Sequence, residues 1–422
     1  MVRLADLEKW ERDHLLVKDA LPLGPPVHKK LSKPLREARL ALISTAGLHD
    51  RDDAVFALAD ATYRVIEGDK EADELMLSHS SSNFDRAGFQ EDVNLVFPID
   101  RMRELEAQGK IGSLASMHFS FMGAGLLPEA YEKTVRDMAR LLRRDGVDAV
   151  FILPVCPNCT RASAAIAYYM ESEGIASTGI SLVREITEAM KPPRMLWTSF
   201  PFGYPLGKPG DSAFQHQVIE AALALLQRDD LPVLEDFPLD VPFTAEAPAC
   251  AISLARPEID VTSWRARLKN EILLMTPWYN RSMKRRGRTM VGVCDASIDE
   301  ITERLADWLD APDGDLPDLT WFKYAMEDVK AFYSEAMIAE PGDYPPGYIM
   351  ARFWNETAFG AALKQYHAHF DAHDELRPFA RVIAPREAVQ GSTGHYAIAD
   401  NGEMIVQTGK RQPQKQGASH DG

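Results

Sequence analysis

The sequence predicts an α/β fold in which a mostly parallel sheet carries helices on both faces, followed by a mainly helical C-terminal domain. Two observations predict this fold class. From residue 39 to about residue 230, short apolar runs alternate with helical patterns, as expected where crossover helices join neighbouring strands. Beyond that region the apolar residues follow helical spacing almost throughout.

The strands expected in the first region comprise residues 40–44, 75–79, 111–118, 147–155 and 174–180. The helices expected there comprise residues 98–108, 128–144, 162–173 and 213–226. Prolines clustered between residues 232 and 248 indicate a linker, and the helices expected beyond it comprise residues 263–284, 297–309, 321–339 and 348–374. We therefore divide the chain into an N-terminal arm (1–38), an α/β catalytic domain (39–235), a helical domain (236–405) and a disordered tail (406–422).

Composition narrows the class of protein. The chain has 422 residues, of which 45% are hydrophobic, so it can bury a substantial core. Its 63 acidic residues exceed its 47 basic residues, and the resulting net charge of −16 argues against nucleic acid and against an anionic membrane as partners. We see no signal peptide and no apolar run long enough to span a membrane, and we expect a cytoplasmic protein.

The motif Cys156-Pro157-Asn158-Cys159 is the strongest chemical signal in the chain. It follows a buried strand and begins a helix, because Pro157 suits the first helical position. Cys156 is therefore expected at the helix N-cap, where partial positive charge favours a thiolate. Three interpretations remain open: a redox or nucleophilic pair, two metal ligands completed by His79 or His118, and an inert structural pair.

Other polar residues follow the expected strands. His49, His79, His118 and Cys156 all fall at carboxyl ends of expected strands, the edge of a parallel sheet where ligands bind. We therefore expect His79, His118 and Cys156 to converge at one edge. His79 and His118 are candidates for acid–base work or metal ligation. The candidate substrate-binding residues are His49, Arg101, which can pair with a carboxylate, Arg161 and Gly123, whose backbone N–H can approach an anion.

Several stretches resemble a known family. They are LALISTAGLH (40–49), RVIEGD (64–69), LMLSHSSSNFD (75–85), DVNLVFPIDRMREL (92–105), GKIGSLASMHFSFMG (109–123) and GVDAVFILPVCPNCTRAS (146–163). In this order and spacing, residues 40–230 resemble the selenocysteine-bearing subunit of D-proline reductase and its relatives in the glycine/sarcosine/betaine reductase component B group. Beyond about residue 235 we see no match.

The resemblance implies roles for both cysteines. The family's selenocysteine falls on Cys156, and its following cysteine falls on Cys159. In that family the selenolate attacks an activated carbon, a C–N bond is cleaved reductively, and the neighbouring cysteine resolves the adduct. This chain has sulfur in place of selenium. The family reductases also use a partner subunit with a pyruvoyl group, and nothing in this sequence suggests that this chain supplies one; the helical domain is a candidate replacement for a partner.

Together these observations predict a thiol-dependent, reductase-like enzyme that cleaves a C–N or C–S bond of a small polar metabolite. Cys156 is the expected nucleophile and Cys159 the resolving thiol, with a thiol reductant protein as partner and a homo-oligomer as one assembly to test. The alternative is a metal-dependent hydrolase or lyase, such as a desulfhydrase, in which Cys156, Cys159, His79 and His118 hold a divalent metal such as zinc. A third alternative is a non-catalytic subunit of a reductase complex.

Overall fold

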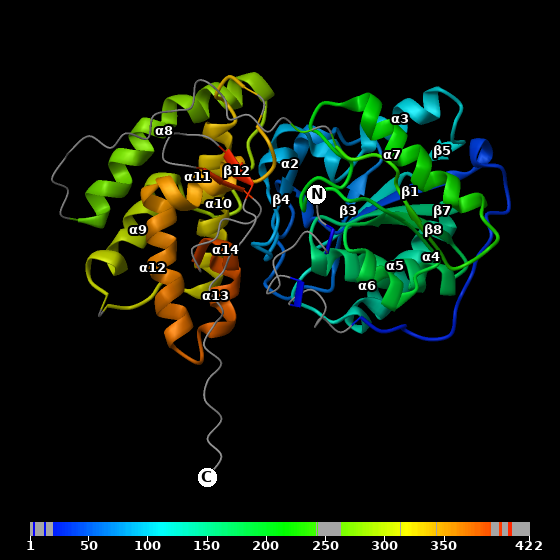
Figure 1. Cartoon of the computed structure of the whole chain (residues 1–422), viewed down its shortest axis with the longest axis horizontal. Helices are drawn as coiled ribbons and strands as arrows, with labels where there is room; N and C mark the ends of the chain where they lie inside the picture. The colour runs from blue at the N-terminus through cyan, green and yellow to red at the C-terminus, as the bar shows by residue number, and fades with distance from the viewer. Residues whose placement is uncertain are drawn as a thin grey trace, which may run out of the picture.

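The computed structural model describes residues 3–4, 12–13, 20–241, 243, 263–312, 314–342, 344–389, 396–398 and 404–406. Within them, an α/β half formed by residues 20–241 lies beside a helical half formed by residues 263–389 (Figure 1). The expected tail beyond residue 406 lies outside the described residues, as do Cys250 and residues 242 and 244–248 of the expected linker. No helix among the described residues is long and apolar enough to cross a membrane.

The main sheet confirms the predicted fold class. Its strands are β1 (Arg39–Ser44), β3 (Tyr63–Glu67), β5 (Ser113–Leu114), β6 (Met117–Phe121), β7 (Ala149–Leu153), β8 (Ala176–Ser181), β9 (Arg194–Trp197) and β10 (Val233–Asp236). The order across the sheet is β10-β9-β8-β7-β1-β6-β3, and β5 also pairs with β1. The strand pairs are parallel except at the β3 edge, where β3 runs antiparallel to β6.

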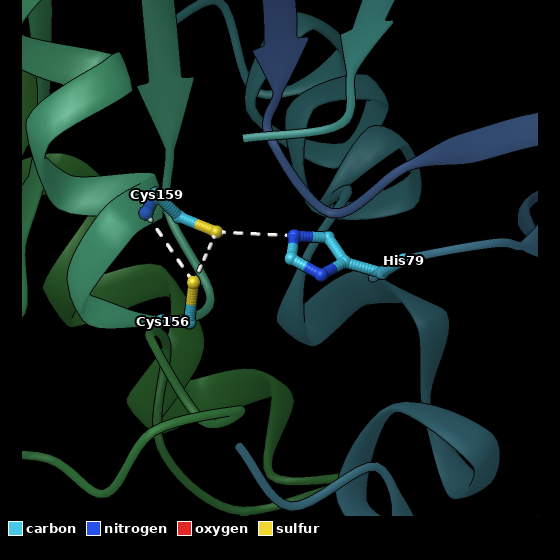
Figure 2. Close-up of side chains that lie close together, drawn as sticks. All are labelled: His79, Cys156 and Cys159. Carbon is cyan, nitrogen blue, oxygen red and sulfur yellow. Dashed lines mark hydrogen bonds between the residues drawn. The ribbon is translucent and has the colours of Figure 1, made fainter. Parts of the chain in front are cut away.

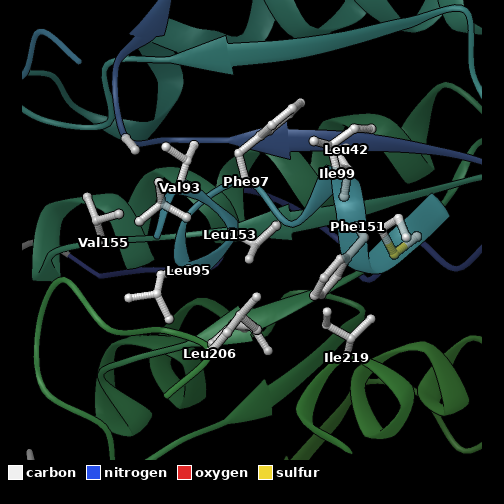
Figure 3. Close-up of a cluster of buried hydrophobic side chains, with 14 of the residues drawn as sticks. Leu42, Val93, Leu95, Phe97, Ile99, Phe151, Leu153, Val155, Leu206 and Ile219 are labelled. Carbon is white, nitrogen blue, oxygen red and sulfur yellow. The ribbon is translucent and has the colours of Figure 1, made fainter. Parts of the chain in front are cut away.

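Alternating side chains on the central strands explain why helices cover both faces. On one face, Leu42 and Phe151 pack with Ile99 of α3 (Ile99–Ala107) and Ile219 of α7 (Ser212–Ala224) (Figure 3). The neighbouring positions point to the opposite face, where they pack against α4 (Glu132–Arg144), α5 (Pro157–Ser172) and α6 (Arg184–Met190). The carboxyl ends of β1 and β7 therefore come together between two helical layers.

Two expected strands differ from the structure. The segment expected at 75–79 is the short β4 (Leu75–Leu77), which pairs antiparallel with β2 (Leu48–Asp50) outside the main sheet. Gly47 causes this departure, because its left-handed φ of 72° turns the chain and its N–H and C=O bond to Phe121 and Ser78. The segment expected at 111–118 is split into β5 and β6, and Asp145 accepts the N–H of Ser116 at the break.

The helical half comprises α8 (Trp264–Arg286), α9 (Ile298–Asp310), α10 (Leu319–Met337), α11 (Tyr348–Glu356), α12 (Ala358–Ala372), α13 (Arg377–Ile383) and α14 (Arg386–Val389). The single helix expected over 348–374 is wrong: Thr357 adopts an extended backbone and caps α12 by accepting the N–H of Gly360. The hairpin of β11 (Tyr396–Ile398) and β12 (Met404–Val406) follows. The chain beside β4 adds α2 (Ala87–Glu91), which contacts α10.

Candidate functional site

Cys156 is the N-cap of α5, as the sequence predicts. β7 ends at Leu153, and α5 begins at Pro157, whose missing N–H costs nothing at this position. Cys156 has extended backbone angles (φ −141°, ψ 172°), and its Sγ accepts the backbone N–H of Cys159 at 3.3 Å. The helix N-terminus therefore stabilises negative charge at the Cys156 sulfur.

Three buried side chains meet at this turn (Figure 2). The sulfurs of Cys156 and Cys159 lie 2.7 Å apart, and His79 Nε2 lies 3.3 Å from the Cys159 Sγ. Both cysteines are free thiols, since a disulfide bond measures about 2.05 Å. The two sulfurs are nonetheless close enough to form one with a small movement.

The hydrogen bonds of His79 define which ring nitrogen carries the proton. The N–H of Ser81 donates to His79 Nδ1 at 3.0 Å, so Nδ1 is an acceptor and the neutral ring holds its proton on Nε2. Nε2 therefore donates toward the Cys159 sulfur. Burial, with further contributions from Arg86 and Lys323, holds the pKa of His79 well below its usual value, so the ring is neutral near pH 7.

The two cysteines differ electrostatically. Burial and the neighbouring Cys156 sulfur raise the pKa of the Cys159 thiol well above its usual value. Its S–H also lies 3.5 Å from the carbonyl oxygen of Thr45, a hydrogen-bond acceptor. Cys159 is thus arranged as a thiol at rest, whereas the helix N-terminus favours charge on Cys156.

Gly123 lies directly against Cys159. A Cβ at this glycine would stand 3.1 Å from both the Sγ and the Cα of Cys159, and 2.8 Å from Cβ of Thr45. Only a residue without a side chain fits this approach. The expectation that its N–H faces an anion is wrong for this structure, since that N–H donates to the carbonyl oxygen of Thr45 at 3.1 Å.

His118 does not join the cysteines. It lies near the start of β6, not at a strand end, because the expected strand is split before it. Its Nδ1 accepts the N–H of Leu42 in the sheet interior, and its ring packs against Phe97. Burial lowers the pKa of His118 to about 4. The expected convergence of three residues is therefore wrong for His118, while His79 and Cys156 do converge.

The remaining candidates make local contacts. His49 lies within β2, not after a main-sheet strand, and its Nδ1 donates to the carbonyl oxygen of Asp50. Arg101 pairs with Glu104 on the same helix. Arg161 donates to the carbonyl oxygen of Leu126. Their expected roles in substrate binding stay predictions.

Ser81 and Thr45 are positioning residues that the sequence reasoning missed. Ser81 sets the His79 tautomer, and Thr45 contacts both Gly123 and Cys159. Tyr131 also lies near the pair, since both sulfurs contribute to the raised pKa of its hydroxyl. The run of serines after His79 was the available sequence signal.

A metal would find three ligands here. His79, Cys156 and Cys159 present donor atoms within 4.8 Å of one another, and no other His, Cys, Asp or Glu of the described chain completes this group. If a metal bound to His79 through Nε2, the ring proton would move to Nδ1. Two N–H donors, that of Nδ1 and that of Ser81, would then face each other. The donor set suits a soft metal, but the present hydrogen bonds suit a metal-free thiol pair better.

The α/β fold places a C-x-x-C motif between a strand and a helix, with a histidine on the second sulfur, an arrangement typical of redox, nucleophilic or metal-binding cysteines. The model of the family glycine/sarcosine/betaine reductase selenoprotein B matches residues 10–154. D-proline reductase subunit gamma of Acetoanaerobium sticklandii is 32% identical over 204 residues, which cover 48% of this chain and 84% of that protein. This chain belongs to that reductase family.

Two further relatives are subunits of reductase complexes. The sarcosine reductase complex component B subunit beta of Peptoclostridium acidaminophilum is 27% identical over 53% of this chain and 52% of that protein. The glycine reductase complex component B subunit gamma of Carboxydothermus hydrogenoformans is 28% identical over 49% of this chain and 48% of that protein. The chain therefore spans about half the length of these two relatives. No solved structure matches it significantly.

Proposed function

We propose that this chain is a thiol-dependent reductase that cleaves a C–N bond of a small polar metabolite, with Cys156 as nucleophile and Cys159 as resolving thiol. The observation that carries the proposal is the asymmetry of the pair: Cys156 Sγ accepts an N–H at a helix N-terminus, and buried Cys159 lies 2.7 Å away under the Nε2 of His79. The same chemistry could cleave a C–S bond of the substrate in place of the C–N bond.

The chemistry balances with two thiols. The Cys156 thiolate attacks the carbon that bears the amine, so a C–S bond forms while the C–N bond breaks. The nitrogen leaves with the electron pair and takes a proton. Cys159 then attacks the Cys156 sulfur, the carbon departs with the electron pair and a proton, and a disulfide remains. The substrate carbon is reduced by two electrons and the thiol pair is oxidised by two.

His79 supports the resolving step. Its neutral ring donates Nε2–H toward Cys159, which stabilises negative charge that develops on that sulfur as its proton leaves. The buried setting excludes water, and this strengthens the hydrogen bond. His79 is therefore proposed as a hydrogen-bond donor that need not titrate near pH 7.

The cycle requires a dithiol to reduce the disulfide, and we propose a thiol reductant protein for this step. The names of the relatives indicate multi-subunit reductase complexes, so a protein partner also fits the proposal. A cytoplasmic location accords with a pair that is reduced in each cycle. If the chain catalyses no turnover, the third alternative applies: it is a non-catalytic subunit that retains the fold.

The second candidate function is metal-dependent hydrolysis or elimination, favoured by the grouping of His79, Cys156 and Cys159. His118 is left out of that candidate, since it bonds to Leu42 in the sheet. A bound zinc ion would act there as a Lewis acid.

Product analysis separates the two candidates. Protein purified without chelator is supplied with D-proline, sarcosine or glycine and an excess of dithiothreitol. The reductase predicts consumption of one dithiol per C–N bond cleaved, with a reduced carbon and either a released amine or, from D-proline, a ring-opened primary amine. Stoichiometric zinc with amine release that consumes no thiol would contradict the reductase and support the second candidate.

A further inference from the structure

A group of three charged side chains and one histidine lies where the helical half meets the α/β half, and we name it the interface cluster: Arg86, Lys323, Glu327 and His49. Lys323 extends from α10 to donate to the carbonyl oxygen of Phe56 at 2.7 Å and to the Ser78 hydroxyl at 3.1 Å. Arg86 donates to the carbonyl oxygen of His79 at 2.7 Å. The cluster therefore adjoins the chain segment that carries the histidine of the thiol site.

Glu327 has unused hydrogen-bonding capacity. It lies one turn after Lys323 on α10, is 3% exposed, and approaches the Lys323 ammonium at 3.5 Å. Beyond this long ion pair with Lys323, neither carboxylate oxygen of Glu327 has a hydrogen bond of good geometry among the described residues. A buried carboxylate in this state is costly unless a ligand or ordered water supplies donors.

His49 offers a second unused acceptor on the opposite side of the junction. Its ring packs edge-on against Phe56, the residue whose carbonyl oxygen binds Lys323. Nδ1 donates to the carbonyl oxygen of Asp50, so Nε2 carries the lone pair of the neutral ring. Nε2 is buried and has no partner in the described chain.

The pKa values agree with this arrangement. Burial lowers the pKa of His49, which keeps the ring neutral and Nε2 an acceptor near pH 7. The Glu327 carboxylate partly opposes that shift, so the two groups act on each other across the junction. Contacts also link the two acceptors across the junction: His49 packs on Phe56, the carbonyl oxygen of Phe56 accepts from Lys323, and Lys323 pairs with Glu327.

We propose that Glu327 and His49 bind the protonated amino group of a small primary or secondary amine, held at the junction of the two halves. Such a cation carries at least two N–H donors, one for each unused acceptor, and its charge complements the carboxylate. This inference rests on the proposed function, because it assigns the nitrogen of the C–N bond to this site. A metal ion fits less well, since the described residues offer it two donors here.

Binding of the amine by Glu327 would give the helical half a role in substrate recognition. Lys323 and Glu327 come from α10, whereas the thiols and His79 come from the α/β half. Because the acceptor atoms are buried, the proposed site requires a local opening to admit the amine.

The experiment uses the full chain with Cys156→Ser, so that binding is measured without chemistry. Sarcosine and betaine are the probes, because both carry a positive nitrogen beside a carboxylate but only sarcosine has N–H donors. Calorimetric titration is expected to show sarcosine binding at least ~10-fold tighter than betaine. Equal affinity for the two compounds, or binding of neither, would overturn the proposal.

Variants on each half locate the site. Glu327→Gln and His49→Phe are each expected to weaken sarcosine binding by roughly 10-fold or more. His49→Phe keeps the ring packing on Phe56, so it remains informative if Glu327→Gln unfolds. The matched control is Glu340→Gln, a buried carboxylate whose two oxygens both accept from Arg352. It should leave the affinity within about twofold; an equal loss in the control would overturn the assignment.

The outcome is separable from that of the proposed function. If sarcosine binds through Glu327 and His49 but the unmodified chain never releases amine, the binding site stands and the thiol chemistry fails. If the chain turns over while Glu327→Gln binds sarcosine normally, the thiol chemistry stands and this site is wrong.

Discussion

Two buried carboxylates, Glu171 of the α/β half and Glu327 of the helical half, differ in how their oxygens are hydrogen-bonded. In the α/β half, Arg194 and Glu171 form a fully buried ion pair, and the same carboxylate also accepts the N–H of Lys29 and of Ser177. In the helical half, Glu327 is equally buried but leaves both oxygens without hydrogen bonds in the described structure. The first arrangement fixes the fold, while the second retains capacity for a ligand.

The difference is specific to the face of α10 that meets the α/β half. Elsewhere in the helical half, Glu271 accepts the N–H groups of Ala358 and Phe359 and the hydroxyl of Tyr333, which secures the start of α12. The helical half can therefore satisfy a buried carboxylate where only structure is at stake. By our proposal the two halves recognise the amine together, through Glu327 of the helical half and His49 of the α/β half, while the thiols come from the α/β half alone.

The largest expected effect concerns the thiol site of the α/β half. Cys156→Ser should lower turnover by roughly 10³-fold or more, because a serine hydroxyl is hardly ionised near pH 7 and is a far weaker nucleophile than a thiolate. Cys159→Ser should permit one turnover and leave a substrate adduct on Cys156, measured by intact-mass spectrometry of the protein.

The matched control is Cys294→Ser, which removes a buried thiol in the helical half. Its turnover should stay near that of the unmodified chain. A metal site would give a different pattern, since Cys156→Ser and Cys159→Ser would then lose metal and activity alike, with no adduct in either.

The next effect concerns stability of the sheet, away from the thiols. Burial lowers the pKa of folded His118 to about 4, against 6.5 for an exposed histidine. Below pH 6.5 the unfolded chain binds a proton that the folded chain resists, so stability is full above pH 6.5 and falls as pH drops toward 4. The expected loss from this residue is roughly 3 kcal/mol.

Urea unfolding of the unmodified chain and of His118→Asn at pH 7 and pH 4.5 checks this expectation. The asparagine oxygen can still accept the N–H of Leu42, so the variant should lose stability less steeply on acidification. Parallel losses in both proteins would show that His118 is already charged, or exposed, in the fold.

The sequence predicted the parts of the molecule that depend on local pattern. Short apolar runs and the signals of helix starts predicted β1, β7 and α5, and one helical turn is enough to bring Cys156 and Cys159 together. Strands β3, β9 and β10 were not predicted, because each is short and partly polar and is defined by its neighbours in the sheet.

The site was predictable only in part for the same reason. His79 reaches Cys159 because Gly47 redirects the chain after β1, a tertiary effect that strand spacing does not encode. His118 was misplaced by the split between β5 and β6. Glu327 carried no sequence signal, since its exceptional state arises from contacts between segments far apart in the chain.

A smaller effect is expected at His79, which couples the two sides of the junction through Ser78 and Arg86. His79→Phe keeps an aromatic ring against Phe84 but removes the donor to Cys159. Disulfide formation in a single turnover should slow by roughly 10- to 100-fold, the range for a buried hydrogen bond to a charged group. Quenched-flow sampling of free thiols measures this rate.

The pH dependence of the resolving step provides an independent check on His79 as a hydrogen-bond donor. Because the pKa of His79 lies well below 6.5, the rate of the resolving step should show no histidine titration between pH 6 and 8. His216→Gln is the control, a half-buried histidine that pairs with Glu104 away from the sulfurs, and it should leave the rate unchanged. A rate that follows a group of pKa near 6.5, and loses that dependence in His79→Phe, would contradict the donor role.

The smallest expected effect tests how closely the thiol site is packed. In Gly123→Ala the new methyl group would stand 3.1 Å from the Cys159 sulfur and 2.8 Å from Thr45, so Cys159 or the backbone of Thr45 must shift by a few tenths of an ångström. We expect a loss of about 1–2 kcal/mol in unfolding free energy, together with faster alkylation of Cys159. Gly109→Ala is the control, because its Cβ meets open space and its cost of roughly 1 kcal/mol comes only from a left-handed φ of 68°. It should lower stability without changing thiol labelling. If both variants label alike, the sulfur does not depend on the close approach of Gly123, and the packing that holds Cys159 under His79 lies elsewhere.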